Sequence, residues 1–148
     1  MDNKSVILEY WKDQRAQARH TETQRATFTN IILIVAAALL GLVANTGFRE
    51  SSLALTVTII FLGLFGAATS AKYYERYNVH IEQAIRFSEV LSAQQQEYDY
   101  EKILGPIRID HDSRNRLARL RLNKLWIAFH LIVALIGFAM SIIIIAIA

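Results

Sequence analysis

The sequence predicts an all-α integral membrane protein with three transmembrane helices and cytoplasmic helical extensions. Three segments almost free of charge, residues 28–48, 53–71 and 125–148, are each about long enough to cross a hydrocarbon core of roughly 30 Å at 1.5 Å per residue. Charged residues gather in the remaining parts of the chain, and one proline and six glycines in 148 residues leave few helix breakers. The chain contains no cysteine, which excludes disulfides and thiolate metal sites.

Residues 1–27 are predicted to form a cytoplasmic helix that continues directly into the first span, because residues 5–28 contain neither glycine nor proline. Ile7, Tyr10, Trp11 and Ala18 fall on one side of this helix and give it a weakly apolar face. The face is expected to pack on the other cytoplasmic helix or on the membrane surface, or else to dock a partner. No cleavable signal peptide is evident, since the first apolar run follows 27 mostly polar residues.

Residues 72–104 are predicted to form an amphipathic cytoplasmic helix, with apolar positions at spacings of three and four and charged positions opposite. No breaker separates it from the second span, so the two are expected to form one long helix. Its spacing suggests packing in a small helical bundle, within one chain or between chains. The predicted packing face consists of Tyr74, Tyr77, Ile81, Ile85 and Leu91, with Ala84 as an alternative to Ile85.

A connector is predicted at residues 105–112, because Gly105 suits a helix C-terminus and Pro106 cannot continue a helix. Asp112 or Ser113 can cap the next helix, a basic juxtamembrane helix over 113–124 that runs into the third span.

Five basic residues of this helix point in different directions at 100° per residue and form a collar, defined as Arg114, Arg116, Arg119, Arg121 and Lys124. A collar can reach anionic lipid headgroups all round the helix, and Trp126 marks the membrane interface beside it. Nucleic-acid binding is the less favoured interpretation, because it usually requires a one-sided basic patch. In an oligomer, several collars could still form a basic ring.

The distribution of Lys and Arg sets the expected orientation. Five lie before the first span, one (Arg49) lies between spans one and two, ten lie in residues 72–124, and none follows the third span. The positive-inside rule therefore predicts a cytoplasmic N-terminus and an external C-terminus in a bacterial inner membrane.

Each span contains small residues four apart, which allow helices to approach closely and predict helix packing and homo-oligomer contacts. These positions are Ala37 with Gly41, Gly63 with Ala67, Gly66 with Ser70, and Gly137 with Ser141.

Polar groups within the spans are few, and their hydroxyls are expected to bond to their own backbone. His130 is a candidate polar or gating residue, with an interfacial histidine bonded to a carbonyl or water as the alternative. The absence of acidic and basic residues deep in the spans argues against a proton-coupled transporter.

The sequence does not predict an enzyme. It contains no glycine-rich phosphate loop, no nucleophile elbow and no HExxH pattern. Asp110, His111 and Asp112 are adjacent, but helix capping explains these acids more simply than a divalent ion does. No catalytic residue, metal ligand or cofactor is therefore expected.

The layout of short apolar spans continuous with long cytoplasmic helices resembles the small multi-span effectors of bacterial defence operons, the SLATT-type membrane proteins. That resemblance covers the whole architecture, although the third span departs from the usual layout of two spans followed by further helices. It implies an oligomer that permeabilises the inner membrane when a partner or nucleotide signal arrives.

The expected function is a homo-oligomeric, channel-like or membrane-perturbing effector, gated through its cytoplasmic helices by a cytoplasmic protein partner. The alternatives are a membrane anchor or scaffold that recruits a soluble complex, and an accessory subunit of a larger transporter.

Overall fold

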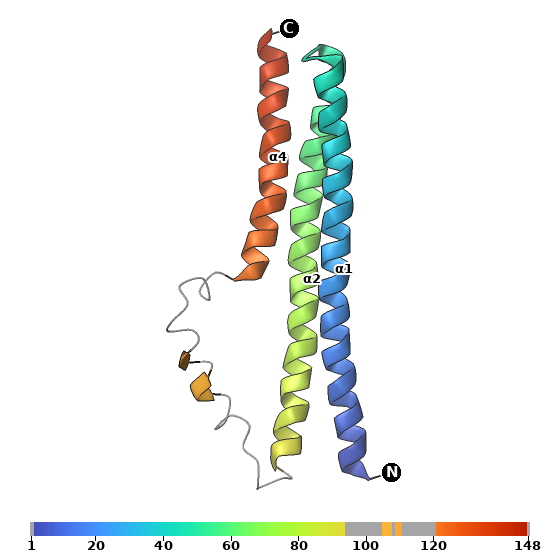
Figure 1. Cartoon of the computed structure of the whole chain (residues 1–148), viewed down its shortest axis with the longest axis vertical. Coiled ribbons are helices and arrows are strands. Elements are labelled where there is room, and N and C mark those ends of the chain that lie inside the picture. The colour runs from blue at the N-terminus through green and yellow to red at the C-terminus, as the bar shows by residue number, and fades with distance from the viewer. Residues whose placement is uncertain (1, 94–104, 108, 111–120, 148) are drawn as a thin grey trace. The chain divides into compact units, whose positions relative to one another are not determined.

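The computed structural model describes residues 2–93, 105–107, 109–110 and 121–147, and these residues form helices without any strand. The elements are helix α1 (Asn3–Thr46), a short 3-10 helix η1 (Glu50–Ser52), α2 (Leu53–Ala93) and α4 (Leu122–Ile147) (Figure 1). Three of the helices, α1, the continuous η1–α2 segment and α4, are long and apolar enough to cross a membrane. The predicted all-helical class with three such helices is therefore confirmed.

Helices α1 and α2 each run without interruption through a polar part and an apolar part, as the lack of breakers predicted. Helix α1 ends at Thr46, two residues before the predicted end of the first span. Gly47 has φ +77°, a left-handed conformation that glycine adopts without steric cost and that stops the helix. The turn to α2 is then short, with the amide of Ser52 donating to the carbonyl of Arg49 at 2.8 Å.

The segment before α4 differs from the prediction. Residues 105–107 and 109–110 are helical where a connector was expected. Helix α4 begins at Leu122, and Arg121 lies outside it, so the predicted continuous helix from Ser113 is wrong at this point.

Several predicted features lie outside the described residues. They are the last part of the amphipathic helix (94–104), His111, the caps at Asp112 and Ser113, and three members of the collar, Arg114, Arg116 and Arg119.

The chain divides into two compact units. Unit 1 comprises Met1–Glu22 and Tyr74–Arg121, and unit 2 comprises Thr23–Tyr73 and Leu122–Ala148. Helices α1 and α2 each contribute to both units, whereas α4 belongs to unit 2.

In unit 1, the first part of α1 packs against the last part of α2. The ring of Tyr10 stacks on that of Phe87 with centroids 5.8 Å apart, and His80 Nδ1 lies 2.8 Å from the amide oxygen of Gln14. Small side chains, Ala18 and Ala84, are buried between the helices.

The predicted packing face on α2 is partly present in unit 1. Tyr74, Tyr77, Ile81 and Leu91 are half-buried, but Ile85 is 50% exposed. Ala84, which the periodicity left open as the alternative to Ile85, takes the buried position instead. Its methyl group fits the close approach of two helices.

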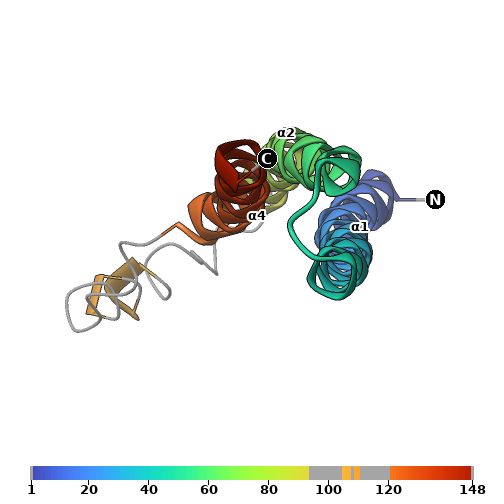
Figure 2. The same ribbon diagram turned by 90° about the horizontal axis from the view of Figure 1, so that it is seen from above.

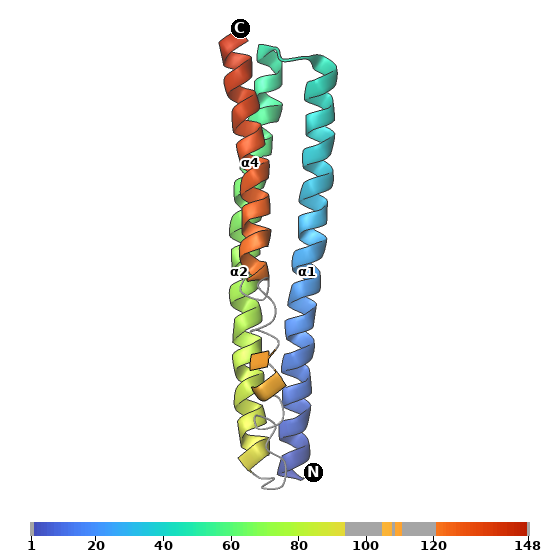
Figure 3. The ribbon, with the colours of Figure 1, turned by 60° about the vertical axis from the view of Figure 1, so that its left-hand side comes forward.

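Unit 2 is a bundle of three helical segments, from α1, α2 and α4. Viewed from above, α2 lies between the other two at the end that carries η1 (Figure 2), and α4 follows α2 along its length (Figure 3). The outer surface is strongly apolar, with Ile34 70%, Phe61 65% and Leu135 63% exposed. The interior combines buried threonine, serine, histidine and arginine side chains with apolar ones such as Ile59 and Val133. Large apolar residues thus cover the outside while several polar residues are buried, which is unusual for a water-soluble domain.

Candidate functional site

Two glycines bring α2 and α4 into backbone contact in unit 2. A Cβ atom on Gly63 would collide with the backbone nitrogen of Ala134 and would lie 2.7 Å from the carbonyl oxygen of His130. A Cβ atom on Gly137 would lie 2.9 Å from the backbone nitrogen of Ile60. Glycine is therefore required at these positions, because any side chain would push the helices apart.

The paired positions follow a regular register. Along α2 and α4, which are antiparallel, Ile60 meets Gly137, Gly63 meets Ala134, and the next turn places Gly66 against the ring of His130.

Helix α1 is parallel to α4, and contacts between the two helices repeat at each turn. Thr29 meets His130, and one turn earlier on both helices Arg25 meets Trp126. The interior of unit 2 is therefore built of layers to which all three helices contribute.

The layer nearest η1 is polar and fully hydrogen-bonded, and we call it the outer polar layer. It consists of Thr46, Ser52, Thr56 and Ser141. The hydroxyl of Ser141 lies 2.7 Å from that of Thr56 and 2.9 Å from the carbonyl of Gly137, and Thr56 donates to Leu53 at 3.0 Å. Thr46 and Ser52 lie 2.9 Å apart, and their hydroxyls also reach the carbonyls of Leu42 and Gly47, each at 2.9 Å.

The middle layer is apolar. Ala36, Ile59 and Val133 form its buried centre, from one helix each, and three partly buried leucines of α1 pack around them: Leu33, Leu39 and Leu40. This layer separates the polar groups on its two sides, so the interior of one chain does not offer a continuous polar path.

The third layer is polar again and contains larger side chains. We call it the inner polar layer and define it as Arg25, Thr29, Ser70, Trp126 and His130. His130 is 0% exposed and its Nε2 lies 3.2 Å from the hydroxyl of Thr29. Arg25 is 3% exposed, and its Cζ lies 5.6 Å from the centroid of the Trp126 ring, within the range of a cation–π contact.

Hydrogen bonding is incomplete in the inner polar layer. Ser70 Oγ, Trp126 Nε1 and His130 Nδ1 are all buried and have no hydrogen-bond partner among the described residues. Ser70 is also unlike the threonines at 58 and 69, whose hydroxyls donate to carbonyls one turn back.

The predicted packing residues separate into two groups. Six are buried, and the three glycines and Ser141 among them contact the opposite helix of the α2–α4 pair: Gly63, Gly66, Ala67, Ser70, Gly137 and Ser141. The remaining pair, Ala37 and Gly41, lies on the exposed surface of α1, and a Cβ atom added to Gly41 would have no neighbour within 4 Å.

The other predicted residues are placed as follows. Arg121 and Lys124, the described members of the collar, are exposed. His130 lies in the interior and is joined to a threonine hydroxyl from another helix, where the sequence suggested a carbonyl or water partner.

Sequence reasoning missed Arg25 and Thr29 as interior residues. A signal was present: Arg25 and Thr29 have the same four-residue spacing as Trp126 and His130, which two parallel helices would bring together.

Within the part of the chain that the structure describes, no three histidine, aspartate or glutamate side chains lie close enough together to hold a metal ion. No family model matches the sequence, and no curated protein or solved structure is significantly similar to it.

Proposed function

We propose that the chain is an integral protein of a bacterial inner membrane and that several copies assemble into a channel-like or membrane-perturbing effector gated through unit 1. The observation that carries membrane insertion is the strongly apolar exterior of unit 2, combined with several polar side chains buried inside it. In water such an exterior would be an extended apolar patch, whereas in lipid it is the favoured surface.

Hydroxyl groups on the exterior of unit 2 support the same proposal. Thr58 and Thr69 donate to the carbonyls of Ala54 and Phe65 at 2.7 and 2.8 Å. These bonds within one helix satisfy each hydroxyl without water, which is what a position facing lipid requires.

The inner polar layer is proposed to lie at the cytoplasmic interface. Trp126 and Tyr73 are residues typical of that depth, and the exposed Arg121 and Lys124 lie just before Trp126. This arrangement favours a cytoplasmic N-terminus, because basic residues are retained on that side.

Assembly from several copies is proposed because the apolar middle layer closes the interior of a single chain. Ala37 and Gly41 offer a contact for another copy, since both are exposed small residues and a Cβ atom on Gly41 would have no neighbour within 4 Å among the described residues. A path would then lie between copies, with an apolar constriction that opens on demand.

Gating through unit 1 is proposed because α1 and α2 belong to both units without a break. A partner that changed how these helices pack in unit 1 would therefore act on the same two helices in unit 2.

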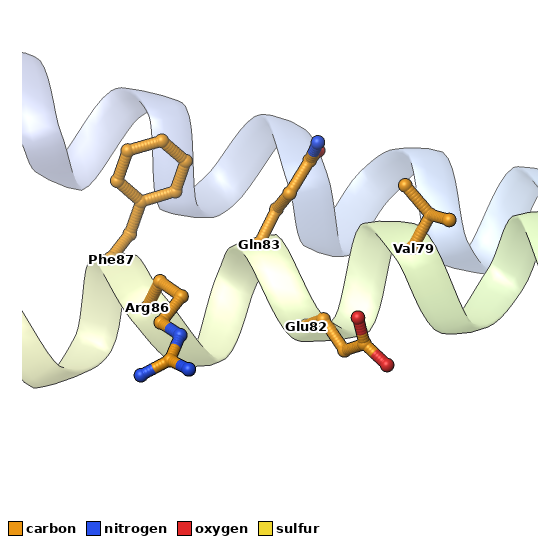
Figure 4. A pocket seen from close by; sticks show the side chains of 5 residues that line it. All are labelled: Val79, Glu82, Gln83, Arg86 and Phe87. Atoms are coloured by element: carbon orange, nitrogen blue, oxygen red, sulfur yellow. The ribbon is translucent and has the colours of Figure 1, made fainter.

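A membrane scaffold is the second candidate, and a specific feature of unit 1 favours it. A shallow hollow of about 320 Å³ is lined by side chains of α2 alone (Figure 4). Apolar Val79 and Phe87 lie beside charged Glu82 and Arg86, with Gln83 between them, a combination suited to docking a helix of a soluble partner.

The test is ion flux from liposomes that contain the purified protein, with the number of copies measured by native mass spectrometry. The proposal predicts a discrete oligomer. It also predicts ion flux, either from the protein alone or after addition of a cytoplasmic extract that supplies the partner. Gly41→Leu should reduce both, whereas the matched change Ala68→Leu, at an exposed position of α2, should reduce neither. A monodisperse single chain without flux under any condition would favour the scaffold.

A further inference from the structure

The inner polar layer is closed, yet three of its polar atoms lack partners. Ser70 Oγ, Trp126 Nε1 and His130 Nδ1 come from two helices that face each other, and each could be satisfied by water. A buried polar group without a partner is unfavourable, so the closed layer is less stable than its packing alone would make it.

Water has no room beside these atoms in the closed arrangement. All three are enclosed, and the His130 ring lies directly against the backbone of Gly66, in the space that a side chain would otherwise fill. Water can reach the atoms only if α4 separates from α2 at this level.

The opposite end of α4 is held more firmly. The hydroxyls of Ser141 and Thr56 are bonded to each other and to backbone carbonyls, and η1 contacts α4 at this end. Ile144 is fully buried there. At the outer end of α4 the polar side chains are therefore fully hydrogen-bonded. At its inner end, water would supply hydrogen bonds that the polar atoms lack.

We propose that α4 pivots about the outer polar layer and that its inner end opens, admitting water to Ser70, Trp126 and His130. Arg25 has interactions of its own, and the inference does not depend on it. The inference rests on the proposed membrane insertion but not on conductance.

The test uses single cysteines in a chain that has none of its own. Ser70→Cys and Ser141→Cys report on the inner and outer layers, and both positions are buried, at 2% and 8% exposed. Ala68→Cys and Ile142→Cys are the matched controls, because each replaces an exposed residue of the same helix near the test position. Their reaction rates correct for the depth of each position in the bilayer. Full-length protein in nanodiscs is treated with a charged, water-soluble thiol reagent, and the rates are compared.

Relative to its depth control, Ser70→Cys should react about tenfold faster than Ser141→Cys, because local opening exposes only the inner end. Static burial alone predicts the reverse order. Equal or slower reaction at position 70 would overturn the proposal.

A second measurement uses native side chains and guards against misfolding of the cysteine variants. Trp11→Phe leaves Trp126 as the single tryptophan, and its fluorescence lifetime is compared in H₂O and D₂O. Opening predicts a longer lifetime in D₂O, because water reaches the indole N–H. An unchanged lifetime would count against opening, and neither assay depends on whether the protein conducts ions.

Discussion

The two polar layers of unit 2 involve the same three helical segments but satisfy their polar groups differently. In the outer polar layer each hydroxyl reaches a carbonyl of its own helix or of the adjoining turn, as Ser141 does with Gly137. In the inner polar layer, the ring nitrogens of Trp126 and His130 extend too far from their own backbone to bond to it. They depend on other helices, and only His130 Nε2 has found a partner.

Side-chain length contributes to this difference but does not alone decide it, since the short Ser70 hydroxyl of the inner polar layer has no partner among the described residues. The hydroxyls of Ser141 and Thr56 each reach a carbonyl of their own helix and also bond to each other, so they join α2 and α4. Histidine and tryptophan have no such local partner, so their layer is satisfied only by a neighbouring helix or by water.

The largest expected effect comes from disrupting the backbone contact between α2 and α4 that lies between the two polar layers. Gly63→Ala places a methyl group against the backbone of Ala134, and we expect unfolding free energy to fall by about 3 kcal/mol. The measurement is unfolding in mixed micelles, followed by circular dichroism.

Gly41→Ala is the matched control, since its Cβ atom has open space, and it should be neutral or slightly stabilising. Equal losses in the two variants would mean that α2 and α4 are not in backbone contact.

Replacing the central side chain of the inner polar layer should have the next largest effect. His130→Ala removes a fully buried ring and leaves a cavity, and we expect a loss of about 2 kcal/mol. The loss is smaller than that of a typical large core residue because an unpartnered nitrogen is removed with the ring.

Thr29→Val keeps the His130 ring in place and removes only the partner of Nε2. It should cost about 1 kcal/mol in the same unfolding assay. If Thr29→Val proved as costly as His130→Ala, the hydrogen bond rather than the packing of the ring would hold this layer together.

The sequence predicted the helices of this fold better than it predicted their contacts. Charge-free stretches and the lack of breakers were enough to predict three apolar helices and the continuity of α1 and α2. Small-residue spacing identified Gly63, Gly66 and Gly137 as packing positions, but spacing alone does not separate contacts within a chain from an exposed pair such as Ala37 and Gly41.

The inner polar layer could not be derived from single segments, because its partners are far apart in sequence. Arg25 was counted only as a basic residue before the first span, and Trp126 only as an interface marker. Their contact depends on the parallel register of α1 and α4, which the long segment between these helices does not constrain.

The hydroxyl groups of the two polar layers offer a direct test of the comparison. Thr56→Val leaves the hydroxyl of Ser141 with only its own backbone and should cost about 0.6–1 kcal/mol. Ser70→Ala removes a buried hydroxyl that has no partner among the described residues, so it should be neutral or stabilising. A clear loss of stability for Ser70→Ala would show that its hydroxyl is satisfied after all and that the two layers are equivalent.

The smallest effect is expected where a hydroxyl faces outward and bonds to its own helix. Thr58 is exposed and donates to the carbonyl of Ala54 at 2.7 Å, so Thr58→Val should change the unfolding free energy by less than about 0.5 kcal/mol. The substitution is the same as Thr56→Val two positions earlier, which keeps side-chain shape and helix propensity matched. Any excess loss at position 56 then measures the contact between helices alone. A loss at position 58 as large as that at 56 would indicate that this face of α2 is buried against another chain, and it would move the proposed contact between copies from α1 to α2.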